Sequence, residues 1–283
     1  VIGGGPAGLE CALALGRRGH QVALAEARRE LGGRVLAEAR LPGLASWIRV
    51  RDHREHMIGK LSNIAVYRES RMMPEDVEGF GAEHVVVATG GIWRRDAFGE
   101  EPLSLPTNDK VLTPNDIDRL AGPAKSVVIY DDDHYAVGSA LAEMLKRQGH
   151  RITYVTPAPV VSSWTQMTDE QGFIQARLMA LDVDLVLSHQ LKDMAGDRTR
   201  FACVYSGRER DLTCDALLLV TGRIPDDALY LDLVRRLPAG TVSAIGDCHA
   251  PSHIADAVFA GHRFAREFGE PAPKIIRRER PEP

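Results

Sequence analysis

The sequence predicts an α/β protein with two Rossmann-like dinucleotide-binding domains, of which the second is inserted in the first. Three observations favour this fold class. The chain opens with a strand, a loop, a helix and a strand, and the same pattern returns 130 residues later. Two continuous apolar runs, Val85 to Ala88 and Ala216 to Val220, each end on Thr-Gly. Such runs are typical of parallel strands that are covered on both faces.

The first pattern predicts a nucleotide site. Leu9 to Arg18 has helical periodicity, Gly19-His20 ends it, and Gln21 to Glu26 reads as the next strand. The loop before the helix has the form G-x-G-x-x-G, which allows a tight turn, close approach of a pyrophosphate and close helix packing. Glu26 follows Gly8 by 18 residues, near the roughly 20 expected for a carboxylate that binds ribose. The alternative is a purely structural glycine turn with Glu26 exposed.

The second pattern has lost this loop. Its parts are a strand from Ser126 to Tyr130, a helix from Ser139 to Gln148 and a strand from Arg151 to Thr156. Alignment on the Gly-His pairs sets Asp133 against Gly3, Tyr135 against Gly5, Gly138 against Gly8 and Thr156 against Glu26. A carboxylate about 4 Å from a phosphate charge repels it by about 1 kcal/mol in water, and by about 4 kcal/mol at an effective dielectric constant of 20. We therefore expect no NAD(P)H in this domain.

The order of these elements predicts the domain ranges. Residues 1–105 and 225–283 are expected to form a split FAD- or ADP-binding Rossmann-like domain, and residues 106–224 a degenerate NAD(P)-binding-like domain. Glu100 to Lys125 contains four prolines and reads as the connector. Val242 to Gly246 is expected to be the last strand, followed by a helix from Ile254 to Phe268.

Composition excludes several classes of protein. The 283 residues carry a net charge of −4, and the basic stretch Lys274 to Arg280 is short and terminal, so no nucleic-acid partner is expected. No apolar run approaches the roughly 18 residues of a membrane span, so no membrane association is expected. The four cysteines are scattered without a CxxC pair, which favours reduced thiols in a cytoplasmic protein.

The sequence assigns no metal site and no catalytic residue. His249 and His253 lack a placed third ligand, and Asp131 to Asp133 lack the alternating spacing of a calcium loop. No Ser-His-Asp or Cys-His arrangement can be assembled. A polar and aromatic cluster after Leu44 could line a nucleotide or a further domain, although a solvated helix face is the simpler interpretation. Its members are Trp47, Arg51, His53, Arg54 and His56.

Several stretches resemble one family in order along nearly the whole chain. They are VIGGGPAGLE, ELGGR, LPGLASW, RDHRE, GAEHVVVATGGIW, VLTP, LLLVTGR and AIGDCHAPSHIADAVFAGHRFARE. Together they resemble the C-terminal half of the trimethylamine dehydrogenase family. That family also includes histamine dehydrogenase, dimethylglycine demethylase and, more distantly, 2,4-dienoyl-CoA reductase.

The resemblance implies a larger parent enzyme. It implies an N-terminal β/α barrel, absent here, that holds FMN and a 4Fe-4S cluster and oxidises a methylated amine. Only two residues precede Gly3, fewer than a strand needs, so we expect Val1 to be a cut inside a longer polypeptide. The resemblance also implies an oxidoreductase acting on C–N bonds, with an electron-transferring flavoprotein as acceptor. A homodimer is expected, and this chain alone is expected to lack the catalytic centre.

The predicted cofactor is ADP or FAD. Gly32-Gly33 offers a further backbone approach, and Asp247 could bind ribose or ribityl hydroxyls or could be a helix N-cap or turn residue. The predicted cofactor-binding residues are Gly3, Gly5, Pro6, Ala7, Gly8, Glu26, Ala27, Gly33, Arg34, Thr89, Gly90, Gly246 and Asp247. Two alternatives remain: a non-catalytic structural nucleotide-binding or interaction module, and an NAD(P)H-dependent FAD oxidoreductase, which the altered second loop disfavours.

Overall fold

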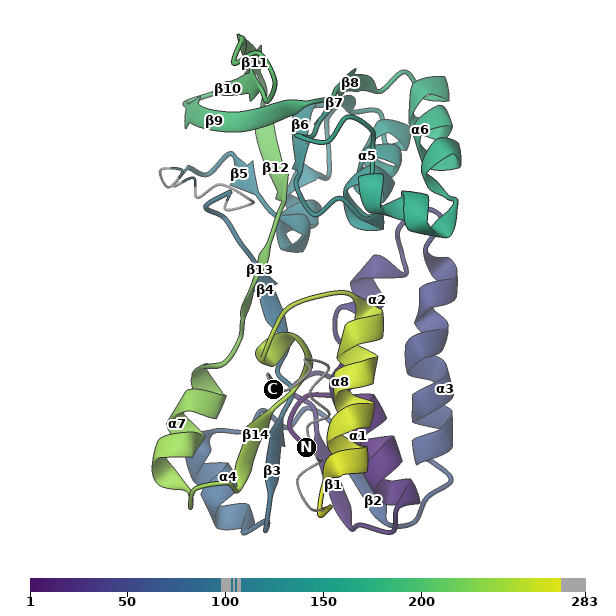
Figure 1. Ribbon diagram of the computed structural model, residues 1–283, viewed down its shortest axis with the longest axis vertical. Coiled ribbons are helices and arrows are strands. Elements are labelled where there is room, and N and C mark those ends of the chain that lie inside the picture. The colour runs from purple at the N-terminus through teal and green to yellow at the C-terminus, as the bar shows by residue number, and fades with distance from the viewer. Residues whose placement is uncertain (98–102, 104, 106–107, 271–283) are drawn as a thin grey trace, which may run out of the picture. The chain divides into compact units, whose positions relative to one another are not determined.

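The computed structural model describes residues 1–97, 103, 105 and 108–270 (Figure 1). The chain divides into two compact units. Unit 1 comprises Val1–Leu36, Ile48–Gly91 and Pro225–Pro283, and unit 2 comprises Ala37–Trp47 and Ile92–Ile224. The basic stretch from Lys274 to Arg280 lies outside the described residues.

Unit 1 is built on parallel strand pairs that meet at Ile2. One pair is β1 (Val22–Ala25) with β2 (Ile64–Tyr67), and the other is β3 (Val85–Val87) with β14 (Val242–Ala244). Ile2 forms parallel bridges to Ala25 and to Val87, so the first residues of the chain lie between the two pairs. The glycine loop therefore starts at the centre of the sheet.

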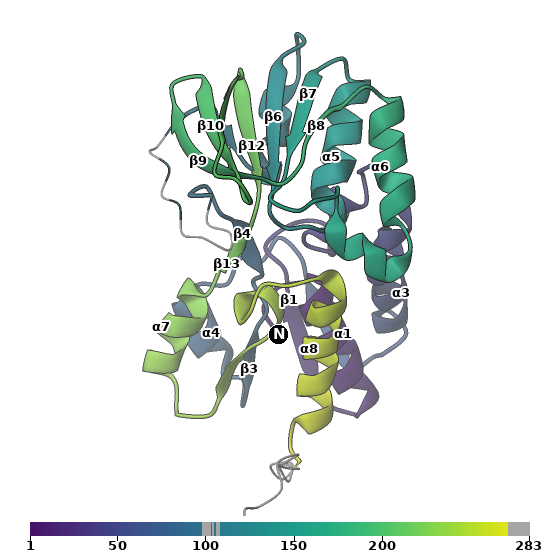
Figure 2. The same cartoon turned by 45° about the horizontal axis from the view of Figure 1, so that its top comes forward.

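Helices cover both faces of this sheet. α4 (Pro74–Phe80) and α7 (Ala228–Arg236) pack with β3 through Val77, Leu233 and Val87. The other face carries α1 (Pro6–Arg17), α3 (Arg49–Ile58) and α8 (Ile254–Glu267), and α1 and α8 run side by side in both views (Figures 1 and 2). A side chain at Gly261 of α8 would lie 2.2 Å from the Ala7 carbonyl oxygen. Only glycine allows this close packing against the first turn of α1.

Unit 2 has a five-stranded parallel sheet in the order β5-β12-β6-β7-β8. These strands are β5 (Val111–Leu112), β12 (Ala216–Val220), β6 (Ser126–Asp131), β7 (Arg151–Val155) and β8 (Asp184–Val186). Alternate residues of β6 face opposite sides, as a strand requires. Val127 and Ile129 pack with α5 (Ala136–Arg147), whereas Val128 and Tyr130 pack with the second sheet.

The remaining elements of unit 2 complete three layers. The second sheet is antiparallel, in the order β11-β10-β9, and α6 lies beside α5. Their bounds are β9 (His189–Ala195), β10 (Arg198–Cys203), β11 (Glu209–Thr213) and α6 (Gln171–Ala180). The connecting strands β4 (Gly91–Trp93) and β13 (Arg223–Pro225) form a two-stranded sheet. The short helical segments of the two units together are α2 (Val35–Glu38), η1 (Ala45–Ile48), η2 (Pro114–Leu120), η3 (Ser163–Thr168) and η4 (Gly246–Cys248), of which η4 lies in unit 1. The predicted α/β fold class is confirmed.

The internal repeat is visible in the helices. α1 and α5 each contain 12 residues, and their bounds differ by the predicted offset of 130. Each is followed by a glycine with positive φ, Gly19 at 90° and Gly149 at 94°. Both helices begin three residues before the predicted start. Loop geometry sets the first turn, at Pro6 in α1 and Ala136 in α5, whereas the prediction started at the apolar stripe.

The units differ from the predicted ranges in two places. Ala37–Trp47 and Ile92 onward lie in unit 2, whereas the prediction kept all residues up to 105 in the first domain. Leu41 and Leu44 pack in the same core as Ile129, so tertiary packing determines where this segment lies. Residue 106 is outside the described residues. The return to unit 1 falls between Ile224 and Pro225.

Candidate functional site

The glycine loop of unit 1 contains two closed positions and one open position. A side chain at Gly3, whose φ is 105°, would lie 2.3 Å from the Ala88 carbonyl oxygen, and one at Gly8 would lie 1.9 Å from the Gly3 oxygen. At Gly5 the only heavy atom of the described residues that a Cβ would meet within 4 Å is the Gly33 Cα, at 4.0 Å. Gly5 therefore leaves open space beside the backbone at the start of α1, where a phosphate can approach the N–H groups of the first turn.

Neighbouring glycines support this loop. The Gly32 N–H donates to the Gly4 oxygen at 2.7 Å, and a Cβ on Gly33, whose φ is 54°, would lie 3.0 Å from the Gly5 Cα. Pro6 occupies the first helical turn, where its fixed φ suits the helix. A Cβ on Gly246 would lie 2.5 Å from that of Ala7, so these two predicted residues pack against each other.

Glu26 is buried against the loop. Its Oε2 accepts the Gly4 N–H at 2.7 Å and its Oε1 accepts the Arg28 N–H at 2.8 Å, while the residue is 9% exposed. The alternative of an exposed Glu26 is therefore wrong. Ala27, the next residue, is exposed. The carboxylate fixes the loop and retains lone pairs that a ribose hydroxyl could use.

Asp247 forms a closed network with Arg34. The Arg34 Nη1 lies 3.4 Å from the Asp247 Oδ2, and the Arg34 Nη2 donates to the Ser252 oxygen at 2.6 Å. The Ser252 N–H donates to the Asp247 Oδ1 at 3.2 Å. Asp247 therefore holds a turn, as one interpretation expected. It is not a helix N-cap, because α8 is capped by His253.

Thr89 and Gly90 are hydrogen bonded to Asp226, near the point where the chain re-enters unit 1. The Thr89 hydroxyl donates to the Asp226 oxygen at 2.5 Å, and the Asp226 N–H donates to the Gly90 oxygen at 3.0 Å. Gly90 has a φ of 92°, which favours glycine. In the structure these two predicted cofactor-binding residues make hydrogen bonds to the segment at which the chain returns to unit 1.

The predicted polar and aromatic cluster does not form one group. Arg54 pairs with Glu10 at 2.6 Å, Arg51 pairs with Glu55 at 3.2 Å, and His53 and His56 are exposed on α3. Trp47 instead lies in unit 2.

The residues that the structure describes contain no group of three metal-ligating side chains. All four cysteines are free, and no described helix could cross a membrane.

In unit 2 an acid at the end of the strand before the loop replaces Glu26. Asp131 is fully buried, and its Oδ1 accepts the N–H groups of Asp133 and His134, each at 3.2 Å. The hydroxyl of Tyr154 donates to its Oδ2. Burial, with a smaller contribution from Asp133, raises the pKa of Asp131 to about 7.

The repeat shows how this acid has moved. His134 occupies the position of Gly4, whose N–H donates to Glu26 from the end of the neighbouring strand. In unit 2 the corresponding N–H donates to the end of the preceding strand. Thr156, at the position of Glu26, is buried, and its Oγ1 accepts the Ala158 N–H at 3.3 Å.

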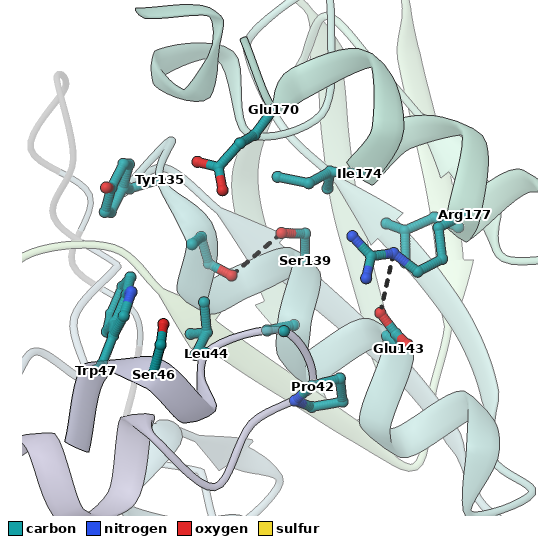
Figure 3. A pocket seen from close by; sticks show the side chains of 14 residues that line it. Pro42, Leu44, Ser46, Trp47, Tyr135, Ser139, Glu143, Glu170, Ile174 and Arg177 are labelled. Carbon is teal, nitrogen blue, oxygen red and sulfur yellow. Dashed lines mark hydrogen bonds and ion pairs between the residues drawn. The ribbon is translucent and has the colours of Figure 1, made fainter. Parts of the chain in front are cut away.

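A ring stands where Gly5 leaves space. Tyr135 occupies the corresponding position and stacks on Trp47, with ring centroids 6.1 Å apart and an interplanar angle of 18° (Figure 3). Burial, followed by the charge of Glu170, raises the pKa of Tyr135. The sequence identified Tyr135 but not its partner, because Trp47 comes from a segment that reads as part of the first domain.

Comparisons with known proteins agree with the resemblance. The family model described as pyridine nucleotide-disulphide oxidoreductase matches residues 1–261. Dimethylamine dehydrogenase from Hyphomicrobium sp. (strain x) is 31% identical over 97% of this chain and 42% of its own length. A probable N-methylproline demethylase from Rhizobium meliloti (strain 1021) is 29% identical over 82% of this chain and 34% of its own.

A solved structure matches the whole chain. Histamine dehydrogenase from Rhizobium sp. 4-9 superimposes with a TM-score of 0.93 at 42% identity, covering 100% of this chain and 46% of that one. The chain thus spans less than half the length of these relatives. The similarity to the C-terminal portion of amine dehydrogenases and demethylases is confirmed.

Proposed function

Because the chain belongs to the pyridine nucleotide-disulphide oxidoreductase family, we propose that unit 1 binds the ADP portion of ADP or FAD at the loop before α1. Family membership implies FAD-type binding, and the relatives are amine dehydrogenases and demethylases. The observation that carries the proposal is the open space beside Gly5. At Gly3 and Gly8, by contrast, backbone atoms of the protein fill the space that a side chain would need.

Each part of the site has a role in this proposal. The first turn of α1 and the positive end of its dipole bind the pyrophosphate. Glu26 accepts a ribose hydroxyl while it holds Gly4, and Gly33 keeps side chains away from Gly5. Arg34, which follows Gly33, is held in place by its ion pair with Asp247. Bound FAD would supply a flavin for electron transfer, whereas ADP would be structural.

We propose further that the parent enzyme oxidises a methylated amine and passes its electrons to an electron-transferring flavoprotein. The support is the loop of unit 2, where Asp131 accepts two loop N–H groups and Tyr135 replaces the open glycine. Both features disfavour a pyrophosphate, so NAD(P)H would not deliver hydride here. The expected homodimer and cytoplasmic location belong to the same proposal.

Gly5→Ala tests the nucleotide site. The φ of Gly5 is −75°, and within the part of the chain that the structure describes the added methyl group meets no atom closer than 4.0 Å. The fold should therefore persist, while the methyl group stands in the path of the pyrophosphate. We expect calorimetry to show at least about tenfold weaker ADP binding, equivalent to about 1.4 kcal/mol.

Gly172→Ala is the matched control, because Gly172 is exposed on α6 with open space around it. It should bind ADP as the unaltered chain does. Unchanged ADP affinity in Gly5→Ala would overturn the proposed site. A flavin in the purified chain that NADPH reduces would instead support the NAD(P)H-dependent alternative.

A further inference from the structure

Unit 2 contains a cavity of about 130 Å³ beside its altered loop (Figure 3). The α5 wall includes Tyr135, Ser139 and Glu143, and the segment around Leu44 and Trp47 forms another side. Residues at the start of α6 and along it complete the lining. The volume is close to the roughly 150 Å³ of an engineered cavity that accepts benzene, so the pocket admits a small organic molecule.

The charges that line this pocket are unequal. Its arginine, Arg177, lies 3.4 Å from the Glu143 Oε2, and Arg147 lies 2.9 Å from the Glu143 Oε1. Two guanidinium groups therefore pair with Glu143, and only that of Arg177 belongs to a residue that lines the pocket. The Glu170 Oε2 accepts a hydrogen bond from the Thr168 hydroxyl at 2.6 Å. Glu170 has no ion-pair partner among the residues that the structure describes. The lining residues thus carry two carboxylates and one guanidinium, and Glu170 is the carboxylate that is not engaged by a guanidinium.

Aromatic rings lie on the same side of the pocket as this carboxylate. Figure 3 shows Glu170 next to Tyr135, with Trp47 below. Tyr135 and Trp47 stack with an interplanar angle of 18°. The faces of aromatic rings attract cations, and most strongly so in tryptophan. A carboxylate near two rings and an apolar wall is a chemical environment suited to an organic cation rather than to a phosphate.

We propose that this pocket binds a small alkylammonium cation, with its positive charge between the Glu170 carboxylate and the Trp47 and Tyr135 rings. Leu44 and Ile174 supply apolar contacts for the alkyl groups. The site is independent of the nucleotide site proposed in unit 1, and either can fail without the other.

Choline and its neutral carbon isostere, 3,3-dimethylbutan-1-ol, test the proposal because they have similar shapes and differ in charge. Titration of the 283-residue chain at constant ionic strength should show saturable choline binding, at least about fivefold tighter than binding of the alcohol. No saturable choline binding into the tens of millimolar, or equal binding of the two, would overturn it. Binding of acetate in preference to choline would also overturn the proposal, because it would show that Arg177 determines which charge the pocket binds.

Glu170→Gln should weaken choline binding about fivefold, the effect of one partly exposed charge pair. Asp169→Asn is the matched control, because it removes the same charge from the neighbouring residue, which does not line the pocket. Trp47→Leu should weaken choline binding about threefold through loss of the ring face. Thermal unfolding checks that each variant is folded. An equal loss in Asp169→Asn and Glu170→Gln would contradict a specific site.

Discussion

The loops before α1 and α5 occupy corresponding positions of the repeat but differ in backbone and in side chains: the residue with positive φ is Gly3 in the first loop and His134, at the position of Gly4, in the second. In unit 1 the Gly4 N–H donates to Glu26, which extends from the neighbouring strand, and Gly5 remains open. In unit 2 the corresponding N–H of His134 donates to Asp131, which ends the preceding strand β6. Relocating one carboxylate and replacing one glycine by Tyr135 changes what the loop can bind, while the helix keeps its length and offset.

The largest effect that distinguishes the two loops should come from their shared third glycine. In Gly8→Ala the new methyl group would lie 1.9 Å from the Gly3 oxygen, a backbone atom that cannot yield. In Gly138→Ala it would lie 2.6 Å from the Asp131 Cγ, which belongs to a side chain. We expect Gly8→Ala to cost more than about 4 kcal/mol of unfolding free energy, and Gly138→Ala about 1 to 3 kcal/mol.

Urea unfolding of both variants measures this difference. Gly79→Ala serves as the control, because a Cβ there meets no atom of the described residues within 4 Å. Asp131→Gly combined with Gly138→Ala should recover part of the loss, because it removes the clashing side chain. Equal costs at Gly8 and Gly138 would mean that Asp131 is as rigidly placed as the backbone.

The buried acid of the second loop should make stability depend on pH. Burial, with Asp133 adding repulsion, raises the pKa of Asp131 from its ordinary value of 3.8 to about 7. Between these two values the folded state keeps a proton that the unfolded state has lost. Stability from this group is therefore fully present below the ordinary pKa and is lost as the pH rises through the folded one. The loss is about 1.4 kcal/mol for each pH unit in this window.

Asp131→Asn should remove this dependence, because the amide oxygen still accepts the loop N–H groups without taking up a charge. We expect the variant to gain about 2 to 3 kcal/mol over the unaltered chain on going from about pH 5 to about pH 8, as measured by chemical denaturation. Asp169→Asn, at an exposed position, controls for the change in net charge. Parallel pH profiles for the unaltered chain and Asp131→Asn would show that Asp131 titrates as an ordinary carboxyl.

Local signals predicted more of the fold than of the contacts. The Gly-His pairs at residues 19 and 149 gave the offset of 130, because each marks the end of a helix by backbone conformation. The three adjacent aspartates predicted a loop that repels a phosphate, but nothing in the pattern showed that Asp131 would be buried and hydrogen bonded. The packing of Leu44 and Trp47 into unit 2 depends on residues far along the chain, such as Tyr135, so no local pattern could reveal it.

The smallest expected effect tests whether the ring or the acid closes the second loop. Tyr135→Gly restores the glycine that corresponds to Gly5 and removes the stacking on Trp47, at a cost of about 1 kcal/mol in stability. We expect no NADPH binding by the variant in calorimetry, because Asp131 still accepts the N–H groups of Asp133 and His134 and still opposes a phosphate. If Tyr135→Gly alone binds NADPH, the ring closes the site. If binding appears only with Asp131→Gly added, the relocated carboxylate is what separates the two halves of the repeat.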